Sequence, residues 1–440
     1  MAEVTLVIRG GSVVTPEGLR RLDLALGDGT VLDLGEAIPG PPGATVLDAA
    51  GCLIGPGLVD LHTHLRQPGR EEAETVESGA RAAALGGYTA VVAMPNTEPA
   101  IDSAGVARDV LALGRDTVAE VAVAGAITVG RAGKALAPIG ELAALGVRIF
   151  TDDGAGVQDG ALMRRALDYA KGVGVTLAQH CEDECLSVGG AMHEGCWSSR
   201  LGLPGIPAAA EESMVARDIQ LVRLTGAPVH FLHLSTAGSV QLVRDAKAEG
   251  LPVTAEAAPH HMLLTHAEVA GYDPVFKVNP PLRSDGDVAA VIAGLCDGTI
   301  DAIATDHAPH APETKDAPFD QAPPGMLGLQ TALPIAWQVL SPRLGPEQIF
   351  ALMSTRPSAI AGLGVTDSRI AGHSAHGGPL DVGATGNLCV FDPSATTAVD
   401  PTRLASRSRN TPYAGRTFTG AVRHTVLRGE PVVIDAVAQR

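Results

Sequence analysis

The sequence predicts an α/β protein: a (β/α)8 TIM barrel with a small β-sandwich domain formed by both termini. Short β-branched runs alternate with Ala-rich helical stretches from about Gly57 to about Leu363, the pattern of repeated βα units. Both ends of the chain instead carry short strands separated by Gly and Pro. No G-x-G-x-x-G, G-x-x-x-x-G-K-S/T or G-x-S-x-G motif marks an open doubly wound sheet.

Eight apolar runs are the expected barrel strands. They are Leu58–Leu65, Thr89–Met94, Glu120–Ile127, Val147–Asp153, Thr176–Glu182, Val229–Ser235, Pro252–Ala258 and Ala302–Asp306. Helical stretches such as Glu74–Leu85, Gly160–Gly172, Glu212–Leu224 and Val240–Glu249 lie between them. Eight such units favour a closed barrel, in which the chemistry lies at the C-terminal ends of the strands.

The two ends of the chain are expected to pair as one β domain. Short strands are predicted at Val4–Ile8, Ser12–Thr15, Leu22–Leu26 and Thr30–Leu34, and again at Gly386–Phe391, Thr417–Thr419 and His424–Leu427. We therefore divide the chain into residues 1–55, the first part of the β domain, residues 56–365, the barrel, and residues 366–440, the second part of the β domain.

Composition limits the possible partners. Thirty-two Lys and Arg against 49 Asp and Glu give a formal charge of −17, which repels phosphate backbones and anionic lipids. Nucleic acid and membrane are thus excluded as expected partners. Six cysteines without a C-x-x-C pair, and an N-terminus that begins Met1-Ala2-Glu3, favour a cytoplasmic protein with neither a disulfide framework nor a signal peptide.

The strongest local signal is the segment Asp60-Leu-His-Thr-His-Leu-Arg66 at the end of the first predicted strand. Residues two apart on a strand point to the same side, so His62 and His64 can bind one metal ion, and Arg66 is expected on the same strand face. Two packed histidines are an equally good interpretation of this segment alone. Recurrence at other strand ends favours the metal, because His180, His233 and Asp306 follow the fifth, sixth and eighth strands.

Imidazoles and carboxylates in this number are ligands of zinc, or of manganese or cobalt in its place. Five ligands are too many for one open tetrahedral ion, which favours two ions that share a bridging ligand. The fourth strand ends in Asp152-Asp153, two adjacent carboxylates of which one can face inward. An acidic pair at a strand end is otherwise typical of a helix N-cap or a solvated loop.

Several segments, in order along nearly the whole chain, resemble the amidohydrolase superfamily and, within it, the longer type of dihydroorotase. They are the Asp60–Arg66 segment, Met94-Pro-Asn-Thr97, Asn279-Pro-Pro-Leu-Arg283, Asp306-His-Ala-Pro-His310 and Gly325-Met-Leu-Gly-Leu-Gln-Thr331. The resemblance implies a zinc-dependent, reversible conversion of N-carbamoyl-L-aspartate to L-dihydroorotate in pyrimidine synthesis.

The resemblance also implies roles for residues. His62 and His64 would bind one zinc ion, His180 and His233 the other, and Asp306 would ligate while acting as general acid and base to a metal-bound hydroxide. Asp153 would bridge the ions. Many relatives use a carboxylated lysine there, but no lysine lies between Lys134 and Lys171. This difference favours the dihydroorotases that use aspartate and leaves open whether one or two ions bind.

Substrate contacts follow from the same resemblance. Arg66 and Asn96 would hold the substrate carboxylate with His310, while Asn279 and the backbone at Pro324 and Gly325 would meet the ring amide. Arg66 in a surface ion pair and Asn279 as a turn former are the alternatives. Residues 311–325 are predicted to form a mobile loop over the site. Cys181 is either a buried thiol or an additional group near the metal.

Two alternatives stay open. Another cyclic amide hydrolase, an allantoinase or a dihydropyrimidinase, would lack the clamp of Arg66, Asn96 and His310. A non-catalytic dihydroorotase-like subunit of aspartate transcarbamoylase would have lost its metal ligands. Besides the small-molecule substrate, the resemblance implies a possible homodimer and a possible complex with aspartate transcarbamoylase.

Overall fold

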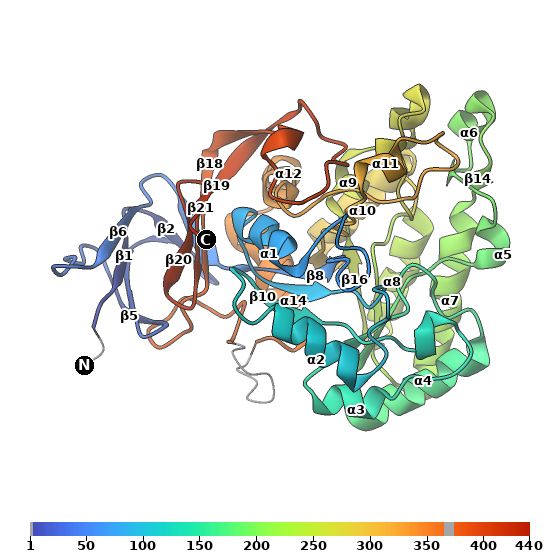
Figure 1. Ribbon diagram of the computed structural model, residues 1–440, viewed down its shortest axis with the longest axis horizontal. Coiled ribbons are helices and arrows are strands. Elements are labelled where there is room, and N and C mark those ends of the chain that lie inside the picture. Colours follow the sequence, from blue (N-terminus) through green and yellow to red (C-terminus); the bar gives the residue numbers. More distant parts are fainter. Residues whose placement is uncertain (1–2, 365–373) are drawn as a thin grey trace.

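The computed structural model describes residues 3–364 and 374–440. It has a larger part, in which helices surround parallel strands, and a smaller β-rich part that holds both ends of the chain (Figure 1). The predicted boundary between residues 365 and 366 lies outside the described residues. No helix in the described ranges is long and apolar enough to cross a membrane.

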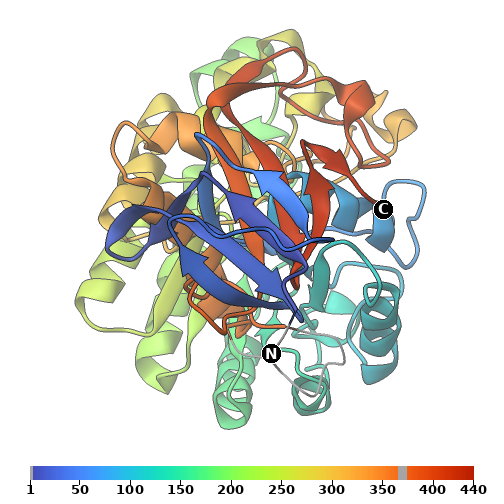
Figure 2. The same cartoon turned by 90° about the vertical axis from the view of Figure 1, so that its left-hand side faces the viewer.

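Two sheets make up the β-rich part, and strands from both ends of the chain share the larger one. Its order is β21-β20-β19-β18-β7-β2-β3, and the smaller sheet has the order β5-β4-β1-β6. Leu388 to Phe391 of β18 pair antiparallel with Pro56 to Leu53 of β7, which joins the two ends (Figure 2). The bounds are β1 (Leu6–Arg9), β2 (Ser12–Thr15), β3 (Gly18–Arg21), β4 (Asp23–Gly27), β5 (Thr30–Gly35), β6 (Thr45–Asp48), β7 (Leu53–Pro56), β18 (Leu388–Ala398), β19 (Thr417–Leu427), β20 (Glu430–Ile434) and β21 (Val437–Ala438).

The two sheets are held together by a shared apolar core. Leu24 and Leu26 from the smaller sheet pack with Ile54, Val390 and Val426 from the larger one, and all five are buried. Alternate residues of a strand face one side of a sheet, so these strands place every second apolar side chain between the sheets. Burial of this aliphatic surface is the main force that joins the two ends of the chain.

One prediction for this part was wrong in its detail. Thr417–Thr419 and His424–Leu427 are not two strands, because β19 runs without a break from Thr417 to Leu427. Gly420 lies in the middle with φ 94°, and the Phe391 ring occupies the space that a Cβ atom would take. In the sequence, Gly420 suggests a break between two strands. In the structure it lies within the single strand β19 and lets the Phe391 ring of the neighbouring strand β18 approach closely.

Eight parallel strands form the centre of the larger part, each within or next to a predicted run. They make a three-stranded sheet, β10-β9-β8, and a five-stranded sheet, β11-β12-β15-β16-β17. Isolated parallel bridges from Gly125 to Phe150 and from Thr63 to His307 link the two sheets at both edges. The bounds are β8 (Leu58–Thr63), β9 (Tyr88–Ala93), β10 (Glu120–Val123), β11 (Ile149–Phe150), β12 (Thr176–Gln179), β15 (Val229–Phe231), β16 (Val253–Ala257) and β17 (Ala302–Ile303).

Helices follow these strands and end where the sequence provides caps. For example, Asp159 caps the first turn of α4, and Gly174 ends that helix in the left-handed conformation. The helices are α1 (Val76–Leu85), α2 (Ala104–Leu113), α3 (Ile139–Ala144), α4 (Gly160–Val173), α5 (Glu184–Ser187), α6 (Cys196–Leu201), α7 (Ala208–Thr225), α8 (Ala237–Ala248), α9 (Pro259–Leu263), α10 (Asp285–Asp297), α11 (Pro312–Lys315), α12 (Ala332–Leu340), α13 (Pro346–Phe350) and α14 (Arg356–Ala361). A short pair, β13 (Met192–His193) and β14 (Gly205–Ile206), lies between α5 and α7.

Most of the parallel strands end earlier than predicted, and the reason lies in the backbone. β8 stops at Thr63, so the expectation that Arg66 lies on the strand face of His62 was wrong. Arg66, His233 and Asp306 have φ values of 60°, 31° and 48°, in the left-handed region. Polar residues at these strand ends therefore leave the regular ladder, and strain of this kind is concentrated at functional sites.

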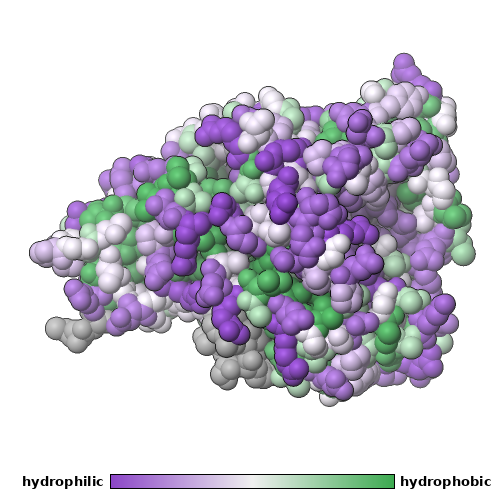
Figure 3. All heavy atoms as spheres, in the orientation of Figure 1, coloured by the Kyte–Doolittle hydropathy of each residue, from purple (hydrophilic) through white to green (hydrophobic). Residues whose placement is uncertain are grey.

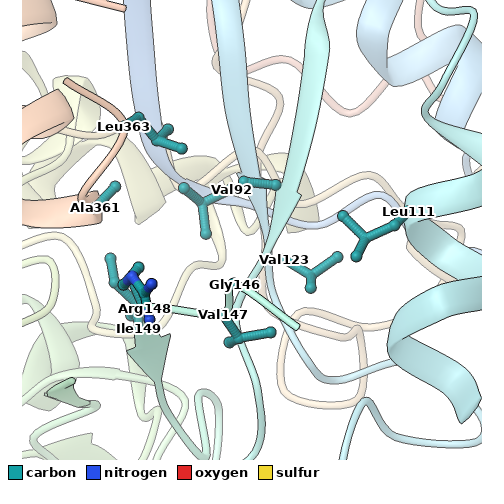
Figure 4. A pocket seen from close by; sticks show the side chains of 10 residues that line it. Val92, Leu111, Val123, Gly146, Val147, Arg148, Ile149, Ala361 and Leu363 are labelled. Carbon is teal, nitrogen blue, oxygen red and sulfur yellow. The ribbon is translucent and has the colours of Figure 1, made fainter. Parts of the chain in front are cut away.

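The face of the molecule seen in Figure 3 is mostly hydrophilic, with hydrophobic residues in separate groups. A small cavity of about 20 Å³ lies near the N-terminal end of β11, among Val92, Val123 and Val147 (Figure 4). Its apolar lining makes it a packing defect rather than a site for chemistry.

Candidate metal centre

The six predicted metal ligands meet at the C-terminal ends of the parallel strands. His62, His64 and Asp153 form one group able to hold a metal ion, and Asp153, His180 and His233 form a second. Within each group the ligand atoms lie within 4.8 Å of one another, and every member is buried. Asp153 belongs to both groups, which is the position expected for a bridging ligand.

Asp153 lies among four imidazoles. Its Oδ1 is 3.4 Å from His62 Nε2, 3.4 Å from His180 Nδ1 and 3.6 Å from His233 Nε2, and its Oδ2 is 3.6 Å from His64 Nε2. The adjacent carboxylate has a different task. Asp152 Oδ1 accepts hydrogen bonds from the backbone N–H groups of Ile127 and Thr128, at 2.9 and 3.0 Å, and so faces away from the centre.

Asp306 lies on the His62 and His64 side of the centre. Its Oδ1 is 3.2 Å from His64 Nε2 and 3.5 Å from His62 Nε2, and its Oδ2 is 4.0 Å from His260 Nε2. One oxygen thus faces the ligand group while the other faces a further buried histidine. This geometry lets a single carboxylate both contact an ion and exchange a proton with a bound molecule.

Electrostatics keep the carboxylates ionised. Burial opposes ionisation of Asp153, but the surrounding imidazoles, His62 first, overcome it and hold its pKa well below the usual value. The pKa of Asp306 is lowered in the same way, with the hydrogen bond from His64 as the main cause against burial. Both groups are therefore ready to act as ligands at neutral pH.

The donor set fits a metal pair. His62 Nε2 is buried and has no hydrogen-bond partner, although two carboxylates face it. A buried nitrogen left without a partner costs free energy unless something else satisfies it. Imidazole and carboxylate donors that surround a shared Asp153 are suited to zinc and similar divalent ions.

Glu256, in β16, is a functional residue that sequence reasoning missed. Its Oε1 is 2.8 Å from His62 Nδ1, and its Oε2 is 3.0 Å from His230 Nε2. Burial opposes its ionisation, but these two hydrogen bonds lower its pKa to about 2. An ionised Glu256 accepts a hydrogen bond from His62 Nδ1–H and so favours the tautomer whose Nε2 lone pair is free for a metal.

A cavity of about 250 Å³ opens beside the centre and contains all the predicted substrate residues. Its lining comprises His64, Arg66, Arg70, Asn96, Asp153, Gly154, His180, His233, Val278, Asn279, Asp306, Ala308, His310, Pro323, Pro324 and Gly325. Arg70 was not predicted; it is exposed at the edge of this cavity. The structure therefore brings the metal ligands and the expected clamp to one place.

Arg66 and Asn96 are fixed by neighbours. The Nε of Arg66 donates to the Pro309 carbonyl at 3.1 Å, and the side chain is buried. Burial, followed by repulsion from Arg70, lowers the Arg66 pKa to about 10, so the guanidinium stays charged at neutral pH. Asn96 Oδ1 accepts from His64 Nδ1 at 2.9 Å, which directs His64 Nε2 toward the carboxylates.

His310 is held in one tautomer. Its Nε2–H donates to the Pro324 carbonyl at 2.8 Å. Burial, with repulsion from Arg66, lowers its pKa to about 3, so the ring is neutral and its Nδ1 is an acceptor. A hydrogen bond from His310 to a substrate carboxylate therefore requires the Nε2 proton to leave Pro324 or the ring to gain a second proton.

Three further predictions concern Asn279, Cys181 and the segment 311–325. Asn279 lines the cavity, and its buried Oδ1 has no partner, which leaves it available to a bound molecule. Cys181 is buried away from that lining, and burial raises its thiol pKa well above the usual value, as in an inert core cysteine. Residues 311–325 include α11 and the buried Phe319, so this segment is more structured than predicted.

Comparisons with known proteins agree with this geometry. A family model described as Dihydro-orotase-like matches residues 51–239. The chain is 48% identical to a dihydroorotase of Pelotomaculum thermopropionicum, with 98% of this chain and 99% of that protein covered. The chain belongs to the dihydroorotase family. Dihydroorotases of Mycobacterium tuberculosis and Streptomyces coelicolor are 47% and 46% identical to it, each with 98% of this chain and at least 98% of the relative covered.

Solved structures share the fold of this chain over nearly its whole length. An L-hydantoinase (dihydropyrimidinase) from Arthrobacter aurescens superimposes with a TM-score of 0.86 at 23% identity, with 100% of this chain and 98% of that chain covered. A D-hydantoinase from Thermus sp. gives a TM-score of 0.82 at 23% identity, over 98% and 96% of the two chains. At this identity the likeness concerns the fold alone.

Proposed function

We propose that the chain is a metal-dependent dihydroorotase that interconverts N-carbamoyl-L-aspartate and L-dihydroorotate for pyrimidine synthesis. The observation that carries the proposal is the position of Asp153, shared by two ligand groups at the base of a cavity that also contains Arg66. Membership of the dihydroorotase family supports the same reaction.

Zinc is the proposed metal, with one or two ions per chain. His62 and His64 would hold one ion and His180 and His233 the other, with Asp153 between them and Asp306 at the first. When bound, such ions make water a stronger nucleophile and polarise a carbonyl oxygen. Manganese or cobalt would suit the same donors.

The residues of the chain have separate tasks in the reaction. Arg66 presents a charged, planar guanidinium to the substrate carboxylate, and Asn96 supports it. In the hydrolytic direction, water attacks the ring carbonyl carbon, and Asp306 takes a proton from the attacking water. The bond between that carbon and the ring nitrogen then breaks, and Asp306 returns the proton to the nitrogen. Synthesis runs through the same steps in reverse.

We also propose that the eight parallel strands close into a (β/α)8 barrel, with domain boundaries near residues 55 and 365. The two isolated bridges, one at each edge between the sheets, support closure. An apolar cluster made only of residues from 1–55 and 366–440, within the sandwich, supports the division. A homodimer, a complex with aspartate transcarbamoylase and a cytoplasmic location stay predictions from the sequence.

The test is an assay of the purified chain with dihydroorotate and carbamoyl aspartate, before and after chelation and after zinc is restored. We expect interconversion that depends on zinc and falls by about 100- to 10,000-fold in Asp306→Asn, the range for loss of a general acid and base. Dihydrouracil and allantoin are the matched control substrates. Faster turnover of either control, or activity that survives full metal removal, would overturn the proposal.

A further inference from the structure

Lys315 is a charged residue that the proposed chemistry does not use. It ends α11, in the segment 311–325 that borders the cavity. Its Nζ donates to the carbonyl oxygens of Pro323 at 2.8 Å, Pro274 at 3.0 Å and Lys277 at 3.3 Å. All three acceptors are backbone groups, and none of the ion pairs among the described residues involves Lys315. An ammonium of this kind is a cross-link between two loops.

The cross-link continues along the cavity wall. Successive carbonyls of residues 323, 324 and 325 each accept from a different side chain: Lys315, His310 at 2.8 Å and Asn410 at 3.1 Å. The Gly325 N–H in turn donates to the Lys277 carbonyl at 2.9 Å. Pro323 and Pro324 have no N–H, so this stretch of backbone is fixed by the three side-chain donors and by the Gly325 N–H.

We propose that Lys315 is a positioning residue for substrate binding, which clamps the cavity wall at residues 323–325 to the segment 274–277. The inference rests on the proposed function, because the clamped backbone is the part expected to meet the ring amide. Without the ammonium, the Pro323 carbonyl loses its donor, and the tie between segment 311–325 and residues 274–277 then depends on the Gly325 N–H bond to the Lys277 carbonyl and the Lys277 Nζ bond to the Asp320 carbonyl. Substrate affinity should fall more than the rate of the chemical step, because Lys315 does not touch the reacting atoms.

Charge around the ammonium makes the clamp sensitive to pH. Burial, followed by repulsion from Lys277, lowers the pKa of Lys315 to about 7, while Asp273 acts in the opposite sense. His310, on the other side, is neutral at this pH and feels the Lys315 charge. As pH rises through about 7, the ammonium becomes an amine with two N–H donors for three carbonyls. The clamp is therefore complete below this pH and weaker above it.

The experiment compares three variants of the zinc-loaded full chain. Lys315→Met removes the donor, Lys315→Arg keeps a permanent charge, and Lys171→Met is the control, because Lys171 also donates to a backbone carbonyl, that of Thr225, on an exposed surface. For Lys315→Met, which removes all three charge-assisted hydrogen bonds, we expect a KM for dihydroorotate at least about tenfold higher with kcat little changed. Lys315→Arg should restore part of the affinity and remove the rise in KM between pH 6 and pH 8.5.

Hydrogen exchange provides a readout that does not depend on activity. Amides of residues 311–325 should exchange faster in Lys315→Met than in the wild-type chain or Lys171→Met. A KM and an exchange rate that match those of Lys171→Met would overturn the inference while the proposed function stands. If the wild-type chain does not turn over dihydroorotate, the proposed function fails, and the exchange comparison still decides whether Lys315 clamps the segment.

Discussion

Glu256→Gln is the substitution that most specifically tests how the chain prepares a metal ligand. Glu256 accepts from His62 Nδ1 at 2.8 Å and from His230 Nε2 at 3.0 Å. A glutamine has the same shape but one acceptor oxygen and one N–H2 group. One of the two histidines must then either lose its partner or change tautomer. If His62 changes, its Nε2 carries the proton and can no longer bind a metal.

The magnitude follows from this loss of orientation. Outer-shell carboxylates that hold a metal-binding histidine contribute about 10- to 100-fold in metal affinity or activity. This range corresponds to about 1.4 to 2.8 kcal/mol. We expect the zinc affinity of Glu256→Gln to fall by an amount in this range, with dihydroorotase turnover falling in parallel when zinc is limiting.

The assay is zinc competition against a chromophoric chelator, with turnover measured on the same samples. Glu249→Gln is the matched control, because Glu249 forms an exposed ion pair with Arg223 remote from the centre. Thermal unfolding in excess chelator checks that both variants fold. A folded Glu256→Gln protein with the zinc affinity of Glu249→Gln would refute the orienting role of Glu256.

Three further outcomes are expected. Arg66→Lys should raise the KM for dihydroorotate by about tenfold or more with a smaller change in kcat, because one ammonium replaces a planar fork; an unchanged KM in steady-state assays would contradict the clamp. Gly325→Ala should lower the free energy of unfolding in urea by about 1 to 3 kcal/mol, because φ is 145° and the new Cβ would lie 2.7 Å from His310 Nε2. An unchanged free energy of unfolding would contradict this and show that residues 323–325 can shift to make room. Burial raises the pKa of Glu256, but its hydrogen bonds outweigh burial and lower the pKa from 4.5 to about 2. Ionised Glu256 therefore stabilises the fold fully above pH 4.5, and this stabilisation is lost as pH falls toward 2. The metal-free wild-type chain should therefore lose stability more steeply than Glu256→Gln between pH 4.5 and 3, and parallel curves would contradict this.

Strand placement could be predicted because parallel strands are buried on both faces. The runs before His180 and His233 contain Leu, Ala, Val and Phe, and the strands lie there. Strand ends were harder to predict. The sixth predicted run extends to Ser235 and the eighth to Asp306. The hydrogen-bonded strands in these runs nevertheless end at Phe231 and Ile303. Left-handed backbone at a histidine or an aspartate has no signal in a single sequence.

The predicted metal ligands could be located because they lie at strand ends: His62 and His64 at the end of β8, and the other four shortly after the ends of β11, β12, β15 and β17. Glu256 was missed since it lies inside a strand, although a lone carboxylate within Val253–Ala257 was a usable sign that a buried partner must exist. The interlocked carbonyls of residues 323–325 could not be predicted. Two of their donors, Lys315 and His310, are near in the sequence, but Asn410 is 85 residues from Gly325, and all three meet these carbonyls only in the folded chain.

The pair of metal groups around Asp153 is tested most directly by anomalous X-ray scattering at the zinc edge on crystals of the zinc-loaded protein. One or two peaks are predicted, at either or both of two positions: between His62, His64 and Asp153, and between Asp153, His180 and His233. A single peak between His62, His64 and Asp153 would restrict the site to one ion. Absence of any peak among these residues, or peaks elsewhere on the chain, would contradict the assignment of this cluster as the metal centre.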